Sequence, residues 1–429
     1  MNVYEATKKR IAFLFDEFEY VYVSFSGGKD SCVVLELCLD YLKEHPDKRM
    51  GVFHLDYEAQ YEATTHYVED TFARLPANCD KFWCALPVSA GCATSVQQDH
   101  WVPWNPKEKE LWVRAIPDGA ITLENHKFPF FKAGMKDYLF QREFGTWVAQ
   151  QRGRTACLIG LRQQESLDRR IMIANTKNDT KYPGILWSTA GLSEEQFNFY
   201  PIYDWRTEDL WTYLAKFDKP YNKLYDLFYQ ASLSIHEMRV ASPFHSQALG
   251  SLKLYQVIEP HTWGKLLSRV NGVNFAGLYG STTLLGWKKI VKPDHLTWKQ
   301  YRDFLLKTLP SKIRKGYERR FAVSEKFWID SGGALPEETI SEIEKSSVEI
   351  EVLETSNRAK KSRVVRFTQY PDDLPEVEDF QAVPSYKRMC VCILKNDFTC
   401  KYMGFGLTKE EQKLRTTALA MFSRIGDPA

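Results

Sequence analysis

The sequence YVYVSFSGGKDS at residues 20–31 is the strongest indication of the fold in this 429-residue chain. Its apolar run predicts a buried strand over 20–25, and the pattern that follows predicts a helix over 30–43. Gly27 and Gly28 lack Cβ atoms, so the backbone between strand and helix can turn sharply and approach a ligand closely. Such a turn aims the N-terminal N–H groups of the helix at one spot, which favours phosphate binding.

The polar side chains of this loop strengthen the prediction of a phosphate site. Lys29 and the hydroxyls of Ser24, Ser26 and Ser31 are donors for phosphate oxygens. Asp30 can hold a magnesium ion or orient the loop. The alternative is an ordinary glycine-rich turn, which does not require serine, lysine and aspartate in this register. We therefore expect a nucleotide-binding loop in which Lys29 and Asp30 take part in catalysis.

Strand and helix signals alternate over the first half of the chain. Further strands are expected at 50–56, 82–88, 155–161 and 199–203, with helices over 61–75 and over 207–214, the latter N-capped by Thr207. Short apolar strands separated by helices favour an α/β fold, a doubly wound parallel sheet covered on both faces. In such sheets ligands bind at the carboxyl ends of the strands, where the strand order reverses.

Two further segments follow predicted strands and supply candidate binding residues. Asp56 ends one strand and can accept hydrogen bonds from an adenine or ribose or hold Mg²⁺, although it can also be a turn-forming residue. In GLRQQES at 160–166, Gly160 permits close backbone approach. Arg162 can pair with a phosphate or sulfate, and we expect it to take part in catalysis with Lys29 and Asp30. Arg169 either contacts the ligand or pairs with Glu165 four residues earlier.

These motifs carry a family resemblance. The loop is not a Walker A loop, which needs four residues between its first glycine and Gly-Lys-Ser/Thr; it resembles the PP-loop of the ATP pyrophosphatase superfamily. Three later segments, GLRQQES, YPIYDW at 200–205 and PYNKLYD at 220–226, resemble phosphoadenosine phosphosulfate (PAPS) reductases. The resemblance covers about half the chain. It implies an adenine nucleotide alpha hydrolase-like (HUP-type) fold, ATP or PAPS as ligand, and Mg²⁺.

Departures from the reductase pattern indicate a different reaction. The chain has no Glu-Cys-Gly-Leu-His-type tail, and Ser234-Ile235 is followed by His236-Glu237 where reductases commonly have a cysteine. The complete Ser-Gly-Gly-Lys-Asp-Ser loop suits cleavage of ATP between the α and β phosphates, with adenylyl transfer and pyrophosphate release. Reduction or binding of a sulfonucleotide is the alternative.

The whole chain is similar to a PAPS-reductase-like subgroup that includes the regulator IbrA. Its members are often encoded beside a ParB-like protein, which implies a protein partner. A nucleotide-sensing regulatory subunit acting with a ParB-like partner is therefore a third interpretation.

Three regions are expected along the chain. Residues 1–240 form the nucleotide-binding domain, with an inserted lid region at about 90–154 that either covers the ligand or packs its own tryptophans. A helical region follows over 241–330. Residues 331–429 form an α+β region with a strand at 363–368 and a terminal helix, which a capping box at 408–411 predicts.

Three cysteines in the last region raise the question of a metal. Zinc or an iron–sulfur cluster is possible at Cys390, Cys392 and Cys400 if a fourth ligand comes from elsewhere. The alternative is a β-hairpin that turns near Asn396-Asp397 and buries small thiols.

Bulk properties set the remaining expectations. The formal net charge is +2, but the basic runs 312–320 and 358–366 are either solvated faces or contacts to nucleic-acid phosphates. No apolar run reaches the roughly 20 residues that span a bilayer, and no membrane association is expected. Nine cysteines without an export signal predict reduced thiols in the cytoplasm.

Overall fold

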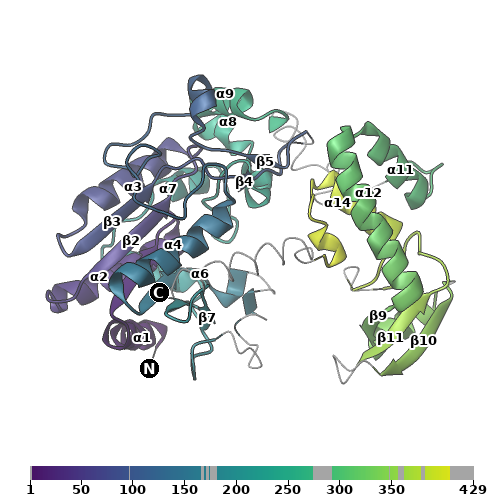
Figure 1. The fold of residues 1–429 in the computed structure, drawn as a ribbon, viewed down its shortest axis with the longest axis horizontal. Helices are drawn as coiled ribbons and strands as arrows, with labels where there is room; N and C mark the ends of the chain where they lie inside the picture. The colour runs from purple at the N-terminus through teal and green to yellow at the C-terminus, as the bar shows by residue number, and fades with distance from the viewer. Residues whose placement is uncertain are drawn as a thin grey trace, which may run out of the picture. The chain divides into compact units, whose positions relative to one another are not determined.

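The computed structural model describes most of the chain (Figure 1). The described residues are 2–95, 97–165, 169–170, 173, 181–273, 292–346, 348–355, 362–377 and 382–405. They fall into two compact units. The first unit comprises Met1–Ala90, His100–Pro243 and Lys253–Arg269, and the second comprises Gly91–Asp99, Phe244–Leu252 and Val270–Ala429.

The first unit is built on a six-stranded sheet with the order β3-β2-β1-β6-β8-β7. All neighbours pair in parallel except β7, which runs antiparallel to β8. The strands are β1 (Tyr20–Ser24), β2 (Met50–Leu55), β3 (Cys79–Cys84), β6 (Thr155–Ile159), β7 (Ser188–Ala190) and β8 (Gln196–Phe199). This confirms the predicted α/β class with a mostly parallel sheet.

The strand order reverses between β1 and β6, in the middle of the sheet. From β1 the chain passes outward to β2 and β3, and later returns to place β6 on the other side of β1. Ser24 at the end of β1 is in register with Phe53 of β2 and with Ile159 of β6. The segments that follow β1 and β6 therefore emerge side by side, where doubly wound sheets bind ligands.

Both faces of the sheet are buried, as the near-continuous apolar strands predict. Alternate residues of β1 point to opposite faces, so Val21 and Val23 join one core while Tyr20 and Tyr22 join another. The first core is covered by α1 (Val3–Glu17), α2 (Lys29–Glu44), α3 (Glu62–Arg74) and α6 (Thr207–Lys216). The second is covered by α4 (Asp137–Arg152), which contributes Phe140, Phe144 and Val148.

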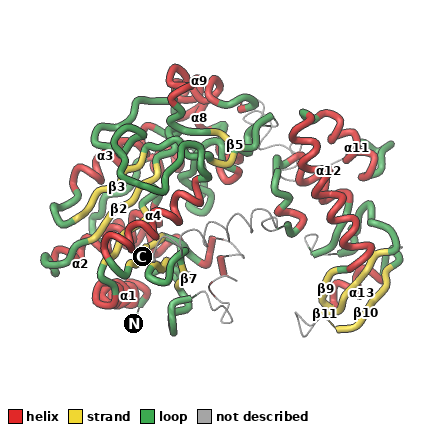
Figure 2. The backbone as a smooth tube through the Cα atoms, in the orientation of Figure 1, coloured by secondary structure: helices red, strands yellow, loops and turns green. Residues whose placement is uncertain are grey.

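Shorter elements complete the first unit and its connections (Figure 2). They are β4 (Ala90–Gly91), β5 (His100–Trp101), η1 (Pro106–Leu111), η2 (Gln163–Glu165), α7 (Leu224–Gln230), α8 (Leu254–Ile258) and α9 (Pro260–Arg269). None of the helices in the described ranges combines the length and apolarity needed to cross a membrane.

The second unit combines a helical cluster with a small antiparallel sheet. Its elements are η3 (Ser246–Ser251), α11 (Trp298–Thr308), α12 (Ser311–Lys326), the π-helix η5 (Phe327–Ser331), β9 (Gly333–Pro336), α13 (Glu337–Glu344), β10 (Ile350–Thr355), β11 (Ser362–Phe367), α14 (Tyr386–Leu394) and η6 (Lys401–Met403). The sheet order is β10-β11-β9. One core lies among α11, α12 and α14, and the other lies between this sheet and α13.

Several local predictions need correction. Arg206, not Thr207, is the N-cap of α6. The expected strand at 199–203 is displaced, because β8 ends at Phe199. The hairpin expected near Asn396 is wrong, since residues 386–394 form helix α14. The predicted terminal helix that begins at 408 lies outside the described residues.

Candidate functional site

The glycine loop joins β1 to α2 at the centre of the first unit. Gly27 has φ of +76°, a conformation that glycine adopts without strain, and Gly28 is the N-cap of α2. The hydroxyls of Ser26 and Ser31 lie 3.0 Å apart, and the Ser26 N–H donates to Ser31 Oγ at 3.1 Å. The predicted serines therefore brace the loop from within.

Two residues from a later segment hold the loop from outside. Asn222 Nδ2 donates to the Gly27 carbonyl at 3.0 Å and to Thr64 Oγ1 at 2.9 Å. The Tyr225 hydroxyl accepts the Lys29 backbone N–H at 2.8 Å. The motif PYNKLYD drew attention to this segment by resemblance, but its contact with a loop nearly 200 residues earlier could not be read from the sequence.

Lys29 is almost fully buried, with 5% of its surface exposed. Its Nζ donates to the Met238 carbonyl at 3.1 Å and lies 3.4 Å from Asp30 Oδ2. Burial lowers the pKa of Lys29, because a charged ammonium loses its hydration there, and Asp30 only partly offsets this effect. An anion that replaced the carbonyl contact would stabilise the protonated form.

Arg162 is turned into the protein rather than toward solvent. It is 3% exposed, and its Nε pairs with Asp30 Oδ1 in a short ion pair. Its Nη1 donates to Gln164 Oε1 at 3.0 Å and to Thr207 Oγ1 at 3.3 Å. The structure thus brings Arg162 and Asp30 together, but here Arg162 positions the loop rather than facing a ligand.

Gly160 is required by close packing against the protein backbone, and not by a contact with a ligand. A Cβ at this position would lie 2.6 Å from the Asp30 carbonyl carbon and from the Ser31 nitrogen. The end of β6 therefore packs directly against the backbone at the start of α2. Close approach is required, as predicted, but in this structure the partner is the protein backbone.

Arg169 forms the i,i+4 ion pair with Glu165 that the sequence left open. Burial lowers the pKa of Arg169. Ligand contact by Arg169 stays a prediction.

Asp56 is buried in a network of its own. It is 1% exposed; Oδ2 accepts from Trp83 Nε1 at 2.8 Å, and Oδ1 accepts from Arg114 Nη2 at 2.5 Å. Burial alone would raise the pKa of Asp56, but Arg114 and the hydrogen bonds hold it below its ordinary value. The structure therefore turns Asp56 inward, and its role as a nucleotide or magnesium ligand stays a prediction.

Glu58, two residues later, is the second acidic anchor and was not singled out by the sequence. It is fully buried at φ of +64° and accepts the backbone N–H groups of Trp104 and Val113. Arg269 donates to both of its carboxylate oxygens, at 2.7 and 3.1 Å. The inserted region and α9 are thus pinned to the segment that follows β2. Trp101 and Trp104 are buried, so the inserted region packs its own tryptophans.

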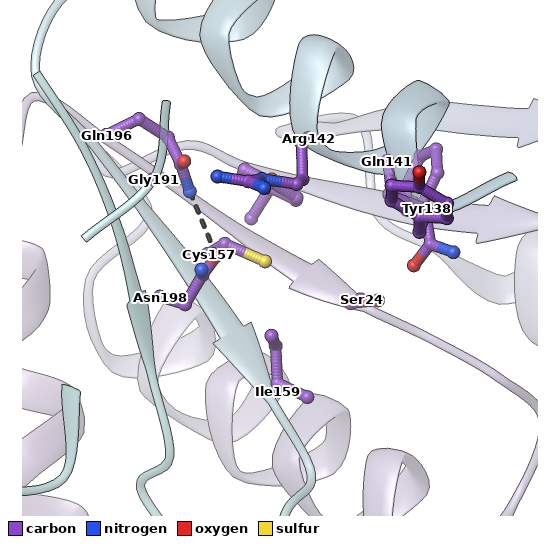
Figure 3. Close-up of a pocket in the computed structure, with 11 residues that line it drawn as sticks. Ser24, Tyr138, Gln141, Arg142, Cys157, Ile159, Gly191, Gln196 and Asn198 are labelled. Carbon is purple, nitrogen blue, oxygen red and sulfur yellow. Dashed lines mark hydrogen bonds between the residues drawn. The ribbon is translucent and has the colours of Figure 1, made fainter. Parts of the chain in front are cut away.

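A cavity of about 240 Å³ lies at the ends of β1 and β6, on the α4 side of the sheet (Figure 3). Ser24 and Ile159, the last residues of β1 and β6, line it together with side chains of α4 and β8. Gln196 Nε2 donates to Asn198 Oδ1 at 3.0 Å across one wall. Its lining combines aromatic rings with amide groups: Tyr22, Phe53 and Tyr138, and Gln141, Gln196 and Asn198.

The three C-terminal cysteines do not form the expected metal site. Cys390 and Cys392 are two residues apart on α14, so their side chains point about 200° apart around the helix. All three are fully buried, and Cys390 Sγ contacts the Trp298 carbonyl at 3.5 Å. The described residues contain no group of three or more His, Cys, Asp or Glu side chains that could hold a metal ion.

Comparisons with known proteins place the chain in a family. A phosphoadenosine phosphosulfate reductase domain matches residues 20–99 and 137–232, which leaves out the part of the insertion that carries Trp101 and Trp104. A domain of unknown function, DUF3440, matches 232–414. The uncharacterized protein YbdN of Escherichia coli (strain K12) is 32% identical over 418 residues, covering 97% of this chain and 93% of YbdN.

The chain belongs to the YbdN family of PAPS reductase-like PP-loop proteins. Placement in the IbrA-like subgroup stays a prediction. Some solved structures resemble part of this chain at low sequence identity. The FMN adenylyltransferase of Candida glabrata is 16% identical, with 52% of this chain and 57% of that chain covered and a TM-score of 0.29. The PAPS reductase of Candida auris is 14% identical, with 53% and 85% covered and a TM-score of 0.28.

The contact at Gly160 gives a direct test of how the loop is held. Gly160→Ala should destabilise the protein by about 1–3 kcal/mol, because the added methyl collides with backbone that has no side chain to rotate away. Gly264→Ala on α9 is the matched control, since a Cβ there meets nothing within 4 Å. Thermal unfolding measures both, and equal melting temperatures for the two variants would contradict the close contact.

The buried pair of Glu58 and Arg269 gives a second test. Glu58→Gln should cost about 3 kcal/mol of unfolding free energy, because it removes the buried carboxylate that pairs with Arg269 and leaves this buried guanidinium only the pair with Glu108, whose side chain is 43% exposed. Glu208→Gln changes a carboxylate that is 54% exposed and pairs with His236, so its expected cost is near zero. Urea unfolding measures the free energy of unfolding of both variants. If Glu58→Gln were as stable as Glu208→Gln, the predicted contribution of the buried pair would be wrong.

Proposed function

We propose that this protein binds an adenine nucleotide at the loop 26–31 and cleaves ATP between its α and β phosphates, transferring AMP to an acceptor. The observation that carries the proposal is the complete loop: a left-handed Gly27, a glycine N-cap on α2, and a buried Lys29 at one point. The helix N-terminus and its N–H groups would stabilise the negative charge of the departing pyrophosphate. Membership in a family defined by a PAPS-binding domain supports an adenine nucleotide as the ligand.

Each loop residue has a role in this proposal. Lys29 would exchange its contact with the Met238 carbonyl for a phosphate oxygen. Arg162 would hold Asp30, and through it the start of α2, in position. Magnesium would neutralise phosphate charge and would enter bound to the nucleotide, with Asp30 as the carboxylate that the loop itself supplies. The cavity beside Ser24 suits a nucleobase, because its walls offer flat rings and amide groups.

The state of the thiols disfavours sulfonucleotide reduction. All nine cysteines lie in the described residues and all are buried. Burial raises the pKa of Cys79 to about 11 and of Cys157 to about 12, so these thiols stay protonated and unreactive. A reductase needs an accessible thiolate, and none is presented here. Binding of PAPS without reduction stays an alternative.

A regulatory role with a ParB-like partner is the other alternative, and it rests on the IbrA resemblance. It differs from the leading proposal in one measurable respect. A nucleotide-sensing subunit binds ATP tightly but releases pyrophosphate only when the partner is present. Calorimetry with ATP, AMP and PAPS, followed by pyrophosphate assays with and without the partner, separates the three interpretations.

Substitution of Gly28 tests the assignment of the loop. A Cβ on Gly28 meets neighbours only at 3.4 Å or more, so the fold should accept a side chain there. Gly28→Val should nevertheless lower pyrophosphate release about 100-fold or more, because its branches cover the N–H groups that contact phosphate. Gly28→Ala is the matched variant with a smaller side chain, and its rate of pyrophosphate release should lie between those of the wild type and Gly28→Val. Unchanged release by Gly28→Val, with an unchanged melting temperature, would rule out this loop as the site.

Proton uptake tests the position of Lys29. Because burial lowers the pKa of Lys29 and a polyphosphate would raise it again, ATP binding should take up protons. The uptake should grow as the pH rises towards the lowered pKa of the free protein. Calorimetry in buffers of different ionisation enthalpy measures it. Lys29→Arg is the control, since arginine is charged throughout and should bind without uptake; equal uptake by both proteins would contradict the phosphate contact.

A further inference from the structure

The outer face of α12, in the second unit, carries an unbalanced line of positive charge. At 100° per residue, Lys312, Lys315, Arg319 and Lys326 fall within about 60° of one another around the helix axis. All four side chains belong to exposed or solvent-facing positions. Over the 14 residues that separate the first from the last, the line is about 21 Å long. We call these four residues the α12 stripe.

The stripe lies opposite the side of α12 that is fixed in the core. Ile313, Tyr317 and Phe321 are buried among α11, α12 and α14. The Tyr317 hydroxyl donates to the Cys392 carbonyl at 3.1 Å, which ties α12 to α14. The helix is therefore held at several points along its length, where it packs beside α11 and α14 (Figure 1).

The two acidic residues of α12, Glu318 and Glu325, lie outside the arc of the helix surface that carries the stripe. Glu318 pairs with Arg314 at 3.8 Å, and Glu325 accepts from Arg302 of α11 at 2.9 Å, both on the flank of the helix. No ion pair between described residues engages any member of the stripe. An ordinary solvated helix face intersperses both signs of charge. The arc of about 60° that holds these four cations contains no acidic residue of α12, and this points to a polyanionic partner.

We propose that the α12 stripe binds the backbone of duplex DNA. A straight, rigid line of about 21 Å matches about six base pairs at 3.4 Å each, and cations on one helix can contact phosphates along a groove. A-form RNA is a poorer fit, because side chains cannot enter its deep, narrow major groove. A membrane surface is disfavoured, because the apolar face that a membrane helix would insert is already buried in the core.

This proposal is independent of the nucleotide chemistry of the first unit. It assigns to the second unit a function that neither the reductase domain nor the loop provides. Backbone contacts of this kind give affinity and position but no base sequence preference by themselves. The stripe would therefore hold the protein on DNA of any sequence at low salt.

The test is fluorescence anisotropy of a labelled 20-base-pair duplex of arbitrary sequence, with the full chain, across a series of salt concentrations. The double variant Lys315→Glu, Arg319→Glu should bind at least about tenfold more weakly at low salt. It should also reduce the slope of log K against log salt by about two, since each phosphate contact contributes about 0.9. Lys8→Glu, Lys9→Glu on α1 is the matched control, because it changes the net charge equally at exposed positions.

Three results would overturn the proposal. They are no binding of the duplex by the wild-type chain, equal loss of affinity in both double variants, and tighter binding of a single-stranded RNA of the same length. Melting temperature and ATP binding are measured on every variant, so that loss of fold or failure of the nucleotide site is recognised separately. If the glutamate variant unfolds, Lys315→Gln, Arg319→Gln removes the same two contacts without charge reversal and should also reduce the slope by about two.

Discussion

The architecture of the candidate site depends on the contact between the end of β6 and the start of α2. Gly160 lies against the backbone of Asp30 and Ser31, and the ion pair of Arg162 with Asp30 closes the same junction. These contacts join the two halves of the sheet at the point where the strand order reverses. The glycine loop lies between them, so its geometry is set before any ligand arrives. Pre-positioned donors of this kind need no reorganisation during a reaction.

A second layer of anchoring surrounds this junction. The segment after β2 presents Asp56 and Glu58, and both are used by the inserted region, through Arg114 and through the N–H groups of Trp104 and Val113. Buried charges in proteins must be paired, because an unpaired ion loses several kcal/mol of hydration. Asp56, which the sequence placed at a ligand, thus acts in this structure together with Glu58 to hold the insertion against the sheet. A nucleotide could contact Asp56 or Glu58 only if their hydrogen bonds to the insertion were exchanged for hydrogen bonds to the ligand.

In the second unit, buried residues and positive charge lie on different sides of the helices. Cys390 and Cys392 are small core residues of α14, and the positive charge lies on the outer side of the neighbouring helix α12. A helix that places Tyr317 in the core and Lys315 and Arg319 in solvent separates the two properties by its period of 3.6 residues. The sequence did not show which residues of the basic run 312–320 face solvent. The packing of α12 places Lys312, Lys315 and Arg319 on its exposed side.

The class of the fold and the position of the loop could be predicted from the amino-acid sequence. A near-continuous apolar strand, glycines at the turn and a serine, lysine and aspartate in register are local properties, and residues 20–31 show them without help from the rest of the chain. Only the tertiary structure decided what those residues touch. Asn222 and Tyr225 reach the loop across nearly 200 residues, and Glu58 meets Arg269 across more than 200. Whether Asp56 points to a ligand or into the protein is decided by such distant partners, because hydrogen bonds and charge pairing depend on position in space and not on spacing along the chain.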